Sequence, residues 1–415
     1  MTKRHYVFNL TAEEPVMNTN STFLKSSRIT SLVLACVVSA GAFAGPQASK
    51  VSGVTVLTLA AAAVKSIDYA NAISLDVPQA LFQSGSQLDS LLEAQAGGAS
   101  SSSGVVGGSG TPAGAGNAAA LGFSAGGAGS GKLNPVTLIA GSKALASQAG
   151  GVAPQDFGTS NHVYTEGRTN ALGDLTTRYY PFRPTGKLWF NIGASSYVCS
   201  ASLIKPGVIV TAAHCVANFG ASQFYSNWQF AAAYDGGVAP YGIATAKQAR
   251  IITAYFNGTD SCAQRGVVCQ NDVAVIVLNS NVGSSAGWYG YGWNGYSYAN
   301  NQAQITQLGY PQSIDGGSWQ ERTDSQGYVS GSMSNNTVIG SAMTGGSSGG
   351  PWLVNLGVAG SNQGAGLAPN GNIVVGVTSW GYTAAGIKEQ GASPFTSNNI
   401  VPLVNAACSA YPGSC

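Results

Sequence analysis

The chain has 415 residues, enough for two or three domains with sizeable cores, so a mini-protein is excluded. Charged residues make up only 8% of it, against about 25% in a typical globular protein. The net charge of +2, with no basic run, argues against nucleic acid or an anionic membrane surface as the main partner. Low charge combined with 57 glycines favours an exported, β-rich protein.

Residues 1–44 are predicted to be a signal-peptide region, with Met17 as a candidate true start. A basic stretch that includes Lys25 precedes an apolar run over 29–43, and small residues at Ala44 mark a cleavage site. A membrane anchor is the alternative, but a run of about 15 residues is shorter than the roughly 20 that a helical span needs.

Residues 45–165 are rich in Ala, Gly and Ser and approach low complexity over 96–131, which predicts flexibility. Leucines recur at helical spacing over 80–96, so a short amphipathic helix is expected there. We interpret 45–165 as a pro-segment plus linker that precedes a domain over 166–415. A plain surface tether is the alternative.

Beyond about residue 170, short runs of β-branched and aromatic residues alternate with Gly, Asn and Ser, which predicts strands in a sandwich or in barrels. The clearest runs are 188–192, 208–211, 273–278, 305–308 and 373–378. One helix is predicted, over 400–411, with Asn398 or Asn399 as its N-cap.

Cleavage after Ala44 would remove Cys36 and leave six cysteines in an oxidising compartment, where disulfides are the default. Fifteen pairings are open in principle. The spacing favours three local pairs: Cys199 with Cys215, Cys262 with Cys269, and Cys408 with Cys415. With three histidines and no CxxC motif in the chain, no metal and no cofactor is expected.

Three separated segments carry the chemistry. A buried strand ends in a tight turn that presents His214, and Asp272 stands at the start of another apolar strand. Ser348 lies in a glycine-rich turn whose backbone N–H groups can face one point. Together they would supply a base, an orienting acid, a nucleophile and an anion-binding nest.

These segments resemble the trypsin-like serine proteases of the chymotrypsin fold. His214 lies in a TAAHC motif, Asp272 in NDVAV and Ser348 in GxSGGP, in the order typical of that family. The segment 374–381 resembles the family's substrate-binding strand. Gly-Tyr-Pro at 309–311 and Met-Thr-Gly-Gly at 343–346 further resemble the secreted bacterial, V8-like or glutamyl-endopeptidase branch.

The resemblance covers about 170–415 and implies an all-β fold of two antiparallel six-stranded β-barrels, over about 180–285 and 295–398, with a C-terminal helix. It implies a serine endopeptidase that is secreted or periplasmic and hydrolyses protein or peptide substrates through an acyl-enzyme. Ser348 would attack the carbonyl, His214 would carry the proton and Asp272 would orient His214. Backbone N–H groups of Gly346 and Ser348 would form the oxyanion hole.

The resemblance places the base of the specificity pocket at Ala342 and Met343 and one wall at Ser379, Trp380 and Gly381. No acid is expected at the base, which disfavours strict preference for Lys or Arg. Glutamyl endopeptidases carry a histidine beside the Trp-Gly pair, and this chain does not. An apolar or mixed P1 side chain is therefore expected.

Ser347 stands where proteases activated by a freed N-terminus carry an acid. The oxyanion hole is therefore expected to form without N-terminal insertion. Latency would come from residues 45–165 covering the cleft as an intramolecular inhibitor. The alternative function is a catalytically silent trypsin-fold binding or adhesion protein, disfavoured because all three catalytic positions are filled. No nucleic acid, and no membrane after signal cleavage, is expected as a partner.

Overall fold

The computed structural model describes residues 48–59, 66–76, 79–80, 121–139, 157–170, 175–299, 301–329, 336–357, 370–382, 384 and 386–415. The predicted signal peptide and residues 81–96 of the expected helix lie outside the described residues. Every described residue belongs to one unit, Gly45–Cys415. None of the helices within the described ranges is long and apolar enough to cross a membrane.

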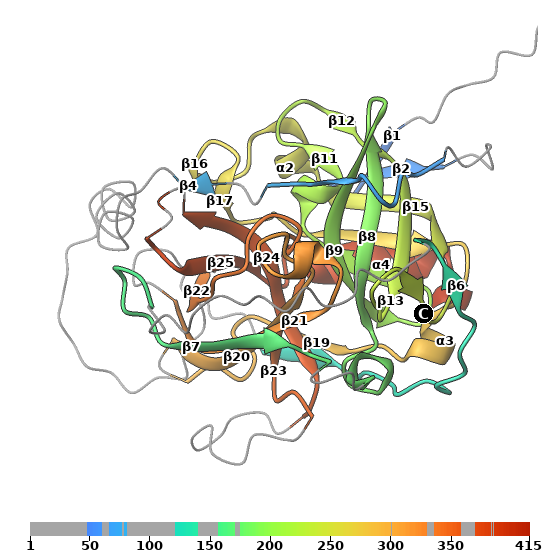
Figure 1. Cartoon of the computed structure of the whole chain (residues 1–415). Coiled ribbons are helices and arrows are strands. Elements are labelled where there is room, and N and C mark those ends of the chain that lie inside the picture. The colour runs from blue at the N-terminus through green and yellow to red at the C-terminus, as the bar shows by residue number, and fades with distance from the viewer. Residues whose placement is uncertain are drawn as a thin grey trace, which may run out of the picture. The chain divides into compact units, whose positions relative to one another are not determined.

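Six antiparallel strands form the first barrel (Figure 1). They are β8 (Thr185–Ile192), β9 (Ser195–Lys205), β10 (Val208–Thr211), β13 (Ser226–Ala232), β15 (Ala244–Ile252) and β18 (Ala274–Leu278). The order is β15-β13-β8-β9-β10-β18, and pairing of β15 with β18 closes the ring. Strands β10 and β18 are rich in valine and isoleucine, and all their side chains are buried, as expected for strands that pack inside a closed barrel.

The second barrel is also closed and antiparallel. Its strands are β20 (Gln302–Gly309), β21 (Glu321–Val329), β22 (Thr337–Gly340), β23 (Pro351–Val354), β24 (Ile373–Tyr382) and β25 (Glu389–Pro394). The order is β23-β20-β21-β22-β25-β24, closed by pairing of β23 with β24. The predicted fold of two six-stranded barrels is confirmed. The five runs singled out in the sequence coincide with all or part of β8, β10, β18, β20 and β24.

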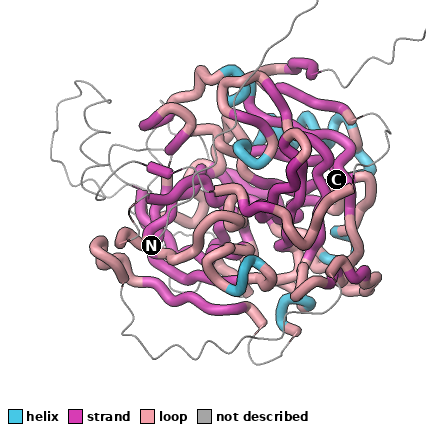
Figure 2. Tube along the Cα trace, turned by 45° about the horizontal axis from the view of Figure 1, so that its top comes forward, coloured by secondary structure: helices cyan, strands magenta, loops and turns pink. Residues whose placement is uncertain are grey.

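Short elements connect and cover the barrels, and strands outnumber helices along the trace (Figure 2). The minor elements are η1 (Thr176–Arg178), η2 (Ala213–Cys215), β11 (Ala217–Asn218), β12 (Gln223–Phe224), β14 (Val238–Ala239), α2 (Thr253–Asn257), β16 (Cys262–Gln264), β17 (Val267–Cys269), α3 (Gly283–Ala286), β19 (Gly290–Trp293), η3 (Asp315–Gly317) and η4 (Pro412–Ser414). The predicted terminal helix is confirmed as α4 (Ile400–Ala410), where Asn399 accepts a hydrogen bond from the Ile400 N–H as the N-cap.

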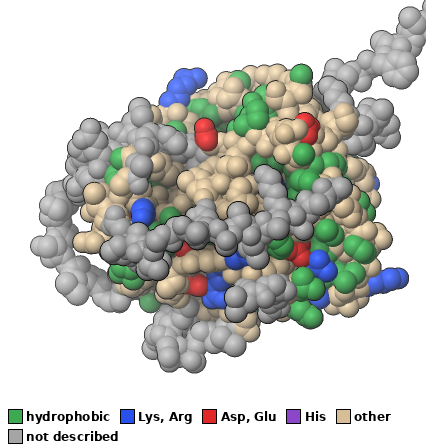
Figure 3. Space-filling view, in the orientation of Figure 1, with side chains coloured by type: hydrophobic (Ala, Val, Ile, Leu, Met, Phe, Trp, Pro, Cys, Tyr) green, Lys and Arg blue, Asp and Glu red, His purple; other side chains and the backbone are tan. Residues whose placement is uncertain are grey.

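The hydrophobic core joins side chains of both barrels. Leu308 and Val377 of the second barrel belong to the same buried cluster as Val210 and Ile276 of the first. Helix α4 buries Leu403 in that cluster too. Charged side chains are few on the face shown in Figure 3, in keeping with the composition. The shared core therefore fixes the position of one barrel relative to the other.

The described parts of residues 45–165 form strands, although the composition of this region predicts flexibility. Their described parts add strands to both barrel sheets: β1 (Ala48–Val51), β2 (Val54–Thr58), β3 (Ile73–Ser74), β4 (Gln79–Ala80), β5 (Gly122–Ser124) and β7 (Tyr164–Arg168), which ends just beyond 165. Strand β6 (Val136–Thr137) pairs with β14 in a separate two-stranded sheet. The hairpin β1–β2 pairs with β15 and buries Val54 and Val56. Composition misses this because a few β-branched residues suffice when a barrel strand supplies the partner backbone.

Three disulfides join Cys199 with Cys215, Cys262 with Cys269, and Cys408 with Cys415, the pairs that the spacing favours. The two groups of neighbouring Cys, His and Asp side chains found in the described ranges each contain a disulfide-bonded pair. Oxidised sulfurs cannot act as thiolate ligands, so neither group suits a metal ion.

Candidate active site

His214 and Asp272 emerge at the same end of one antiparallel strand pair. Thr211, the last residue of β10, lies opposite Ala274, the first residue of β18. His214 follows β10 within η2, and Asp272 precedes β18 by two residues. The antiparallel register thus brings together two side chains that are 58 residues apart in the chain.

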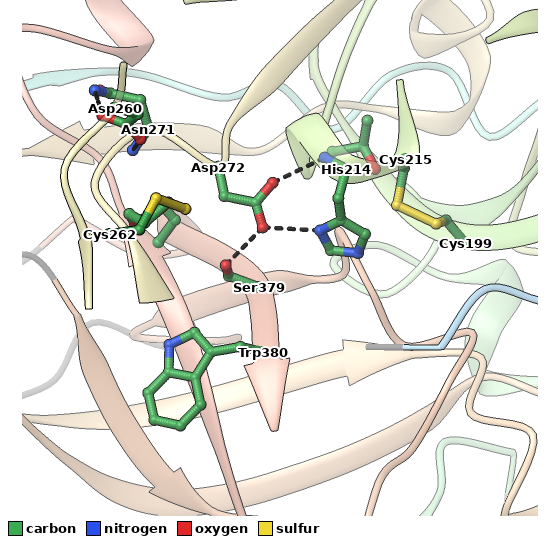
Figure 4. Close-up of polar contacts among 12 residues, drawn as sticks. Cys199, His214, Cys215, Asp260, Cys262, Asn271, Asp272, Ser379 and Trp380 are labelled. Atoms are coloured by element: carbon green, nitrogen blue, oxygen red, sulfur yellow. Dashed lines mark hydrogen bonds and ion pairs between the residues drawn. A yellow bond between two sulfur atoms is a disulfide. The ribbon is translucent and has the colours of Figure 1, made fainter. Parts of the chain in front are cut away.

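The Asp272 carboxylate accepts three hydrogen bonds and so fixes the imidazole (Figure 4). The His214 backbone N–H donates to Oδ1 at 2.9 Å, and the ring Nδ1 lies 2.8 Å from Oδ2. The Ser379 hydroxyl donates to Oδ2 at 2.6 Å. Both residues are buried, at 7% exposure for His214 and 1% for Asp272. With the Nδ1 proton held by the carboxylate, the neutral ring presents Nε2 as an acceptor.

Ser348 lies in a turn that is tied to the first barrel. Its carbonyl accepts a hydrogen bond from the Ser200 N–H at 2.7 Å, and the Ser200 hydroxyl donates to the Gly346 carbonyl at 2.8 Å. Gly349 has φ of +76°, and a Cβ there would lie 2.0 Å from Thr211 Oγ1. Only glycine therefore allows the nucleophile turn to approach the strand that leads to His214.

The Ser348 hydroxyl and His214 Nε2 are both buried, and neither has a hydrogen-bond partner within the described part of the chain. Unpaired buried polar atoms are rare and costly, and they concentrate where catalysis uses them. These two atoms are a hydroxyl donor and an imidazole acceptor, the two kinds of group that nucleophilic catalysis joins.

Neutral side chains hold the loop before the nucleophile. Ser347 donates to the Thr344 carbonyl at 2.7 Å and accepts from Gln390 Nε2 at 3.2 Å. Gln307 donates to Gln390 Oε1 at 2.5 Å and accepts from the Ser341 hydroxyl at 2.9 Å. This network is buried, and sequence motifs do not reveal it because its members come from distant strands.

One expected oxyanion donor is engaged by the chain itself. Gly346 has φ of +94°, and its N–H donates to the Leu75 carbonyl at 3.1 Å. Leu75 follows β3 and belongs to the segment that crosses from β9 to β24.

A cavity of about 630 Å³ lies beside the nucleophile turn. Ala342, Met343 and Gly381, which the resemblance assigns to the specificity pocket, line it. Two other residues assigned to that pocket do not. Ser379 is directed to Asp272, and Trp380 is fully buried, with its indole N–H donating to Asn336. Their strand borders the site, but its pairing with β25 shifts register between Thr378 and Trp380, and neither Ser379 nor Trp380 lines the cavity.

The charged groups around the cavity differ from the expectation that no acidic side chain lies at the bottom of the specificity pocket. Glu389 and Lys388 of the second barrel line it, together with Asp76. Glu389 Oε1 lies 3.0 Å from His162 Nδ1, whose other ring nitrogen bonds the Gln326 carbonyl. Burial lowers the pKa of His162, but the bonds to Glu389 and to that carbonyl outweigh it and raise the pKa overall.

Strand β7 supports the cavity through Glu166, which bonds the backbone of the cavity-lining residue Ala342. Glu166 accepts hydrogen bonds from the Ala342 N–H at 2.8 Å and from Thr323 at 3.0 Å. Burial raises the pKa of Glu166, and the two hydrogen bonds work against that rise. No motif points to Glu166 or His162, because only the pairing of β7 with β21 brings them to the pocket.

Two closed six-stranded barrels with this site at their junction define a protein of the chymotrypsin fold. The model of the trypsin family, described as Trypsin, matches residues 180–401. That is more than half of the chain, and the chain belongs to the trypsin family.

The chain is 27% identical over 139 residues to the Extracellular metalloprotease of Bacillus subtilis (strain 168), a match that covers 33% of this chain and 41% of that protein. The match therefore spans less than half the length of that relative. Among solved structures, the thermostable serine protease AL20 from an extremophilic microorganism is 24% identical, with a TM-score of 0.45, over 55% of this chain and 97% of that one. The protease Anisep from Arthrobacter nicotinovorans is 25% identical, with a TM-score of 0.43, over 55% and 96%. A Glu endopeptidase in complex with MPD is 21% identical, with a TM-score of 0.44, over 59% and 96%.

Proposed function

We propose that this protein is a secreted serine endopeptidase that cleaves protein or peptide substrates with Ser348, His214 and Asp272 as its catalytic triad. Membership of the trypsin family supports the class of reaction. The observation that carries the assignment of residues is the buried His214–Asp272 pair, which leaves Nε2 unpaired at the same barrel junction as the unpaired Ser348 hydroxyl.

In the proposed reaction, Ser348 Oγ bonds to the substrate carbonyl carbon and its proton passes to His214 Nε2. The C–N bond then breaks as the same proton moves to the leaving nitrogen, and water hydrolyses the acyl-enzyme. Asp272 stabilises the imidazolium that forms on the way. Backbone N–H groups of Gly346 and Ser348 would bind the oxyanion, each contributing about 3 to 4 kcal/mol to the transition state.

A fluorophosphonate probe tests this proposal directly. The processed protein should be labelled at Ser348, and Ser348→Ala should remove the label because it removes the proposed nucleophile. Ser280, exposed beyond β18, gives the matched control, and Ser280→Ala should label like the unchanged protein. Absence of label from the processed protein would support a catalytically silent binding protein instead, and label that persists in Ser348→Ala would contradict Ser348 as the nucleophile.

The cavity suggests an apolar or mixed P1 side chain. Met343 and Ile387 contribute apolar surface, and the opposite charges of Lys388 and Glu389 offset each other. Glu389 is also held by His162. A peptide library should therefore show hydrophobic or small P1 residues rather than one charge type. A cleavage profile dominated by Arg, Lys or Glu would contradict this prediction.

Export and latency belong to the same proposal. Residues 1–44 would direct secretion, with cleavage after Ala44, and residues 45–165 would act as a pro-segment. Contacts of Leu75 and Asp76 with the nucleophile loop support an inhibitory role for that segment.

A further inference from the structure

Residues 66–76 and 79–80, here called the strap, cross the proposed active site from one barrel to the other. Ile73 and Ser74 of β3 pair in parallel with Tyr197 and Val198 of β9, in the first barrel. Further along, β4 pairs in parallel with the end of β24, in the second barrel. Figure 1 shows this blue part of the chain running from the side of β2 to β4.

The centre of the strap lies on the nucleophile loop. The Leu75 N–H donates to the Val198 carbonyl at 3.0 Å, and the Leu75 carbonyl accepts from the Gly346 N–H at 3.1 Å. A Cβ on Gly345 would lie 3.1 Å from both the Leu75 carbonyl oxygen and Asp76 Oδ1. Ser348 itself is fully buried in this arrangement. A peptide carbonyl of the chain thus holds a donor that the proposed reaction needs for its oxyanion.

The direction of the strap is opposite to that of a substrate. In the proposed reaction the acyl part of the substrate fills the cavity of the second barrel, and the leaving nitrogen must face His214 on the first barrel. In the strap, the chain passes Leu75 on its way from β9 to β24. The nitrogen bonded to the Leu75 carbonyl is that of Asp76, and it therefore leads toward the second barrel, away from His214.

We infer that the strap is an intramolecular peptide ligand of the active site, bound in the non-productive direction, so that it inhibits the enzyme without being cut. This inference rests on the proposed function. Attack of Ser348 Oγ on the Leu75 carbonyl would form an adduct whose C–N bond cannot break, because His214 cannot deliver the proton to the Asp76 nitrogen. The adduct can only return to the intact peptide.

Anchors remote from the catalytic residues hold the strap in place. The Asp68 N–H donates to the Ser196 hydroxyl at 3.1 Å. The Tyr69 hydroxyl donates to Gln229, and its ring lies edge-on to Trp189 with centroids 5.3 Å apart. These contacts allow the strap to be loosened without touching the catalytic machinery.

The first experiment measures the rate at which a small fluorophosphonate probe labels the full chain. Tyr69→Ala removes the aromatic contact and should raise the rate about tenfold. Leu75→Pro removes the N–H that bonds Val198 and should raise it by about the same factor. Tyr179→Ala is the matched control, because that ring is 64% exposed and lies outside the strap, and its rate should equal that of the unchanged chain.

The second experiment tests the direction of the strap. The unchanged full chain is incubated with a peptide substrate, and intact mass is followed while the substrate is hydrolysed. The bond between Leu75 and Asp76 should stay whole. A fragment that begins at Asp76 and is absent from Ser348→Ala would show productive binding and overturn the inference.

The labelling rates separate failure of this inference from failure of the proposed function. If labelling depends on Ser348 but has the same rate in the unchanged chain, Tyr69→Ala and Leu75→Pro, the inference about the strap is overturned and the proposed function stands. Labelling of no variant, or labelling that survives Ser348→Ala, would contradict the proposed function and the inference together.

Discussion

The Asp272→Asn variant is expected to lose about four orders of magnitude in kcat while keeping its fold. The His214 backbone N–H must keep an oxygen at the Oδ1 position, so the new amide NH₂ takes the place of Oδ2. There it donates to Nδ1 and moves the ring proton to Nε2. A protonated Nε2 cannot accept the proton of Ser348, so the base is lost although every side chain remains in place.

Asp260 offers the same substitution on the neighbouring loop as a control (Figure 4). Its carboxylate accepts from the Asn271 N–H at 2.8 Å and from the Asn271 side chain at 2.7 Å, and neither bond involves His214. Burial raises the pKa of Asp260 to about 6. Asp260→Asn should change kcat by less than about tenfold, since one hydrogen bond is at stake. Steady-state kinetics on one peptide substrate, with thermal unfolding alongside, would compare the two; similar losses would contradict the assignment of Asp272.

Replacing Cys199 and Cys215 together by alanine should lower the free energy of unfolding by about 3 kcal/mol, given the separation of 16 residues. The same change should also slow labelling of Ser348. Cys199 precedes Ser200, which holds the nucleophile turn, and Cys215 follows His214. The disulfide therefore links the two halves of the catalytic site, and its loss loosens both.

The pair Cys408 and Cys415 provides the matched control. It closes a separation of seven residues between α4 and the chain end, far along the chain from the nucleophile turn. Its double alanine variant should lose about 2 kcal/mol and label at the unchanged rate. Denaturant unfolding and probe kinetics measure both quantities. Slower labelling in the control, or none of the expected loss for Cys199 and Cys215, would show that the disulfide does not position the site.

The barrels and the position of the site could be predicted from sequence because local patterns specify them. Runs such as 208–211 are apolar and β-branched throughout, which is typical of strands buried on both faces. His214 and Asp272 sit at the ends of such runs, so the pairing of two strands is enough to bring them together. At these positions the sequence motifs and the predicted strands point to the same location, and the structure has His214 and Asp272 in contact there.

The strap, the glutamine network and the charged groups around the cavity could not be predicted in this way. Each depends on contacts between distant elements, as when β7 brings His162 to Glu389, 227 residues away. The segment 66–80 carries no strand signal of its own. Its order comes from pairing with β9 and β24 and from contacts such as that of Tyr69 with Trp189, none of which local sequence shows.

The hairpin β1–β2 sets a limit on how this chain can be shortened. It covers Gln248–Ile252 of β15, and Val54 and Val56 share the core of the first barrel. Excision of all of 45–165 from the folded protein would leave that stretch of backbone without its partner, an edge that invites strands of other molecules and aggregation. Removal of the strap alone, by cuts on both of its sides, would instead free the active site while the hairpin keeps the edge capped. Solubility and activation thus favour different boundaries for a mature enzyme.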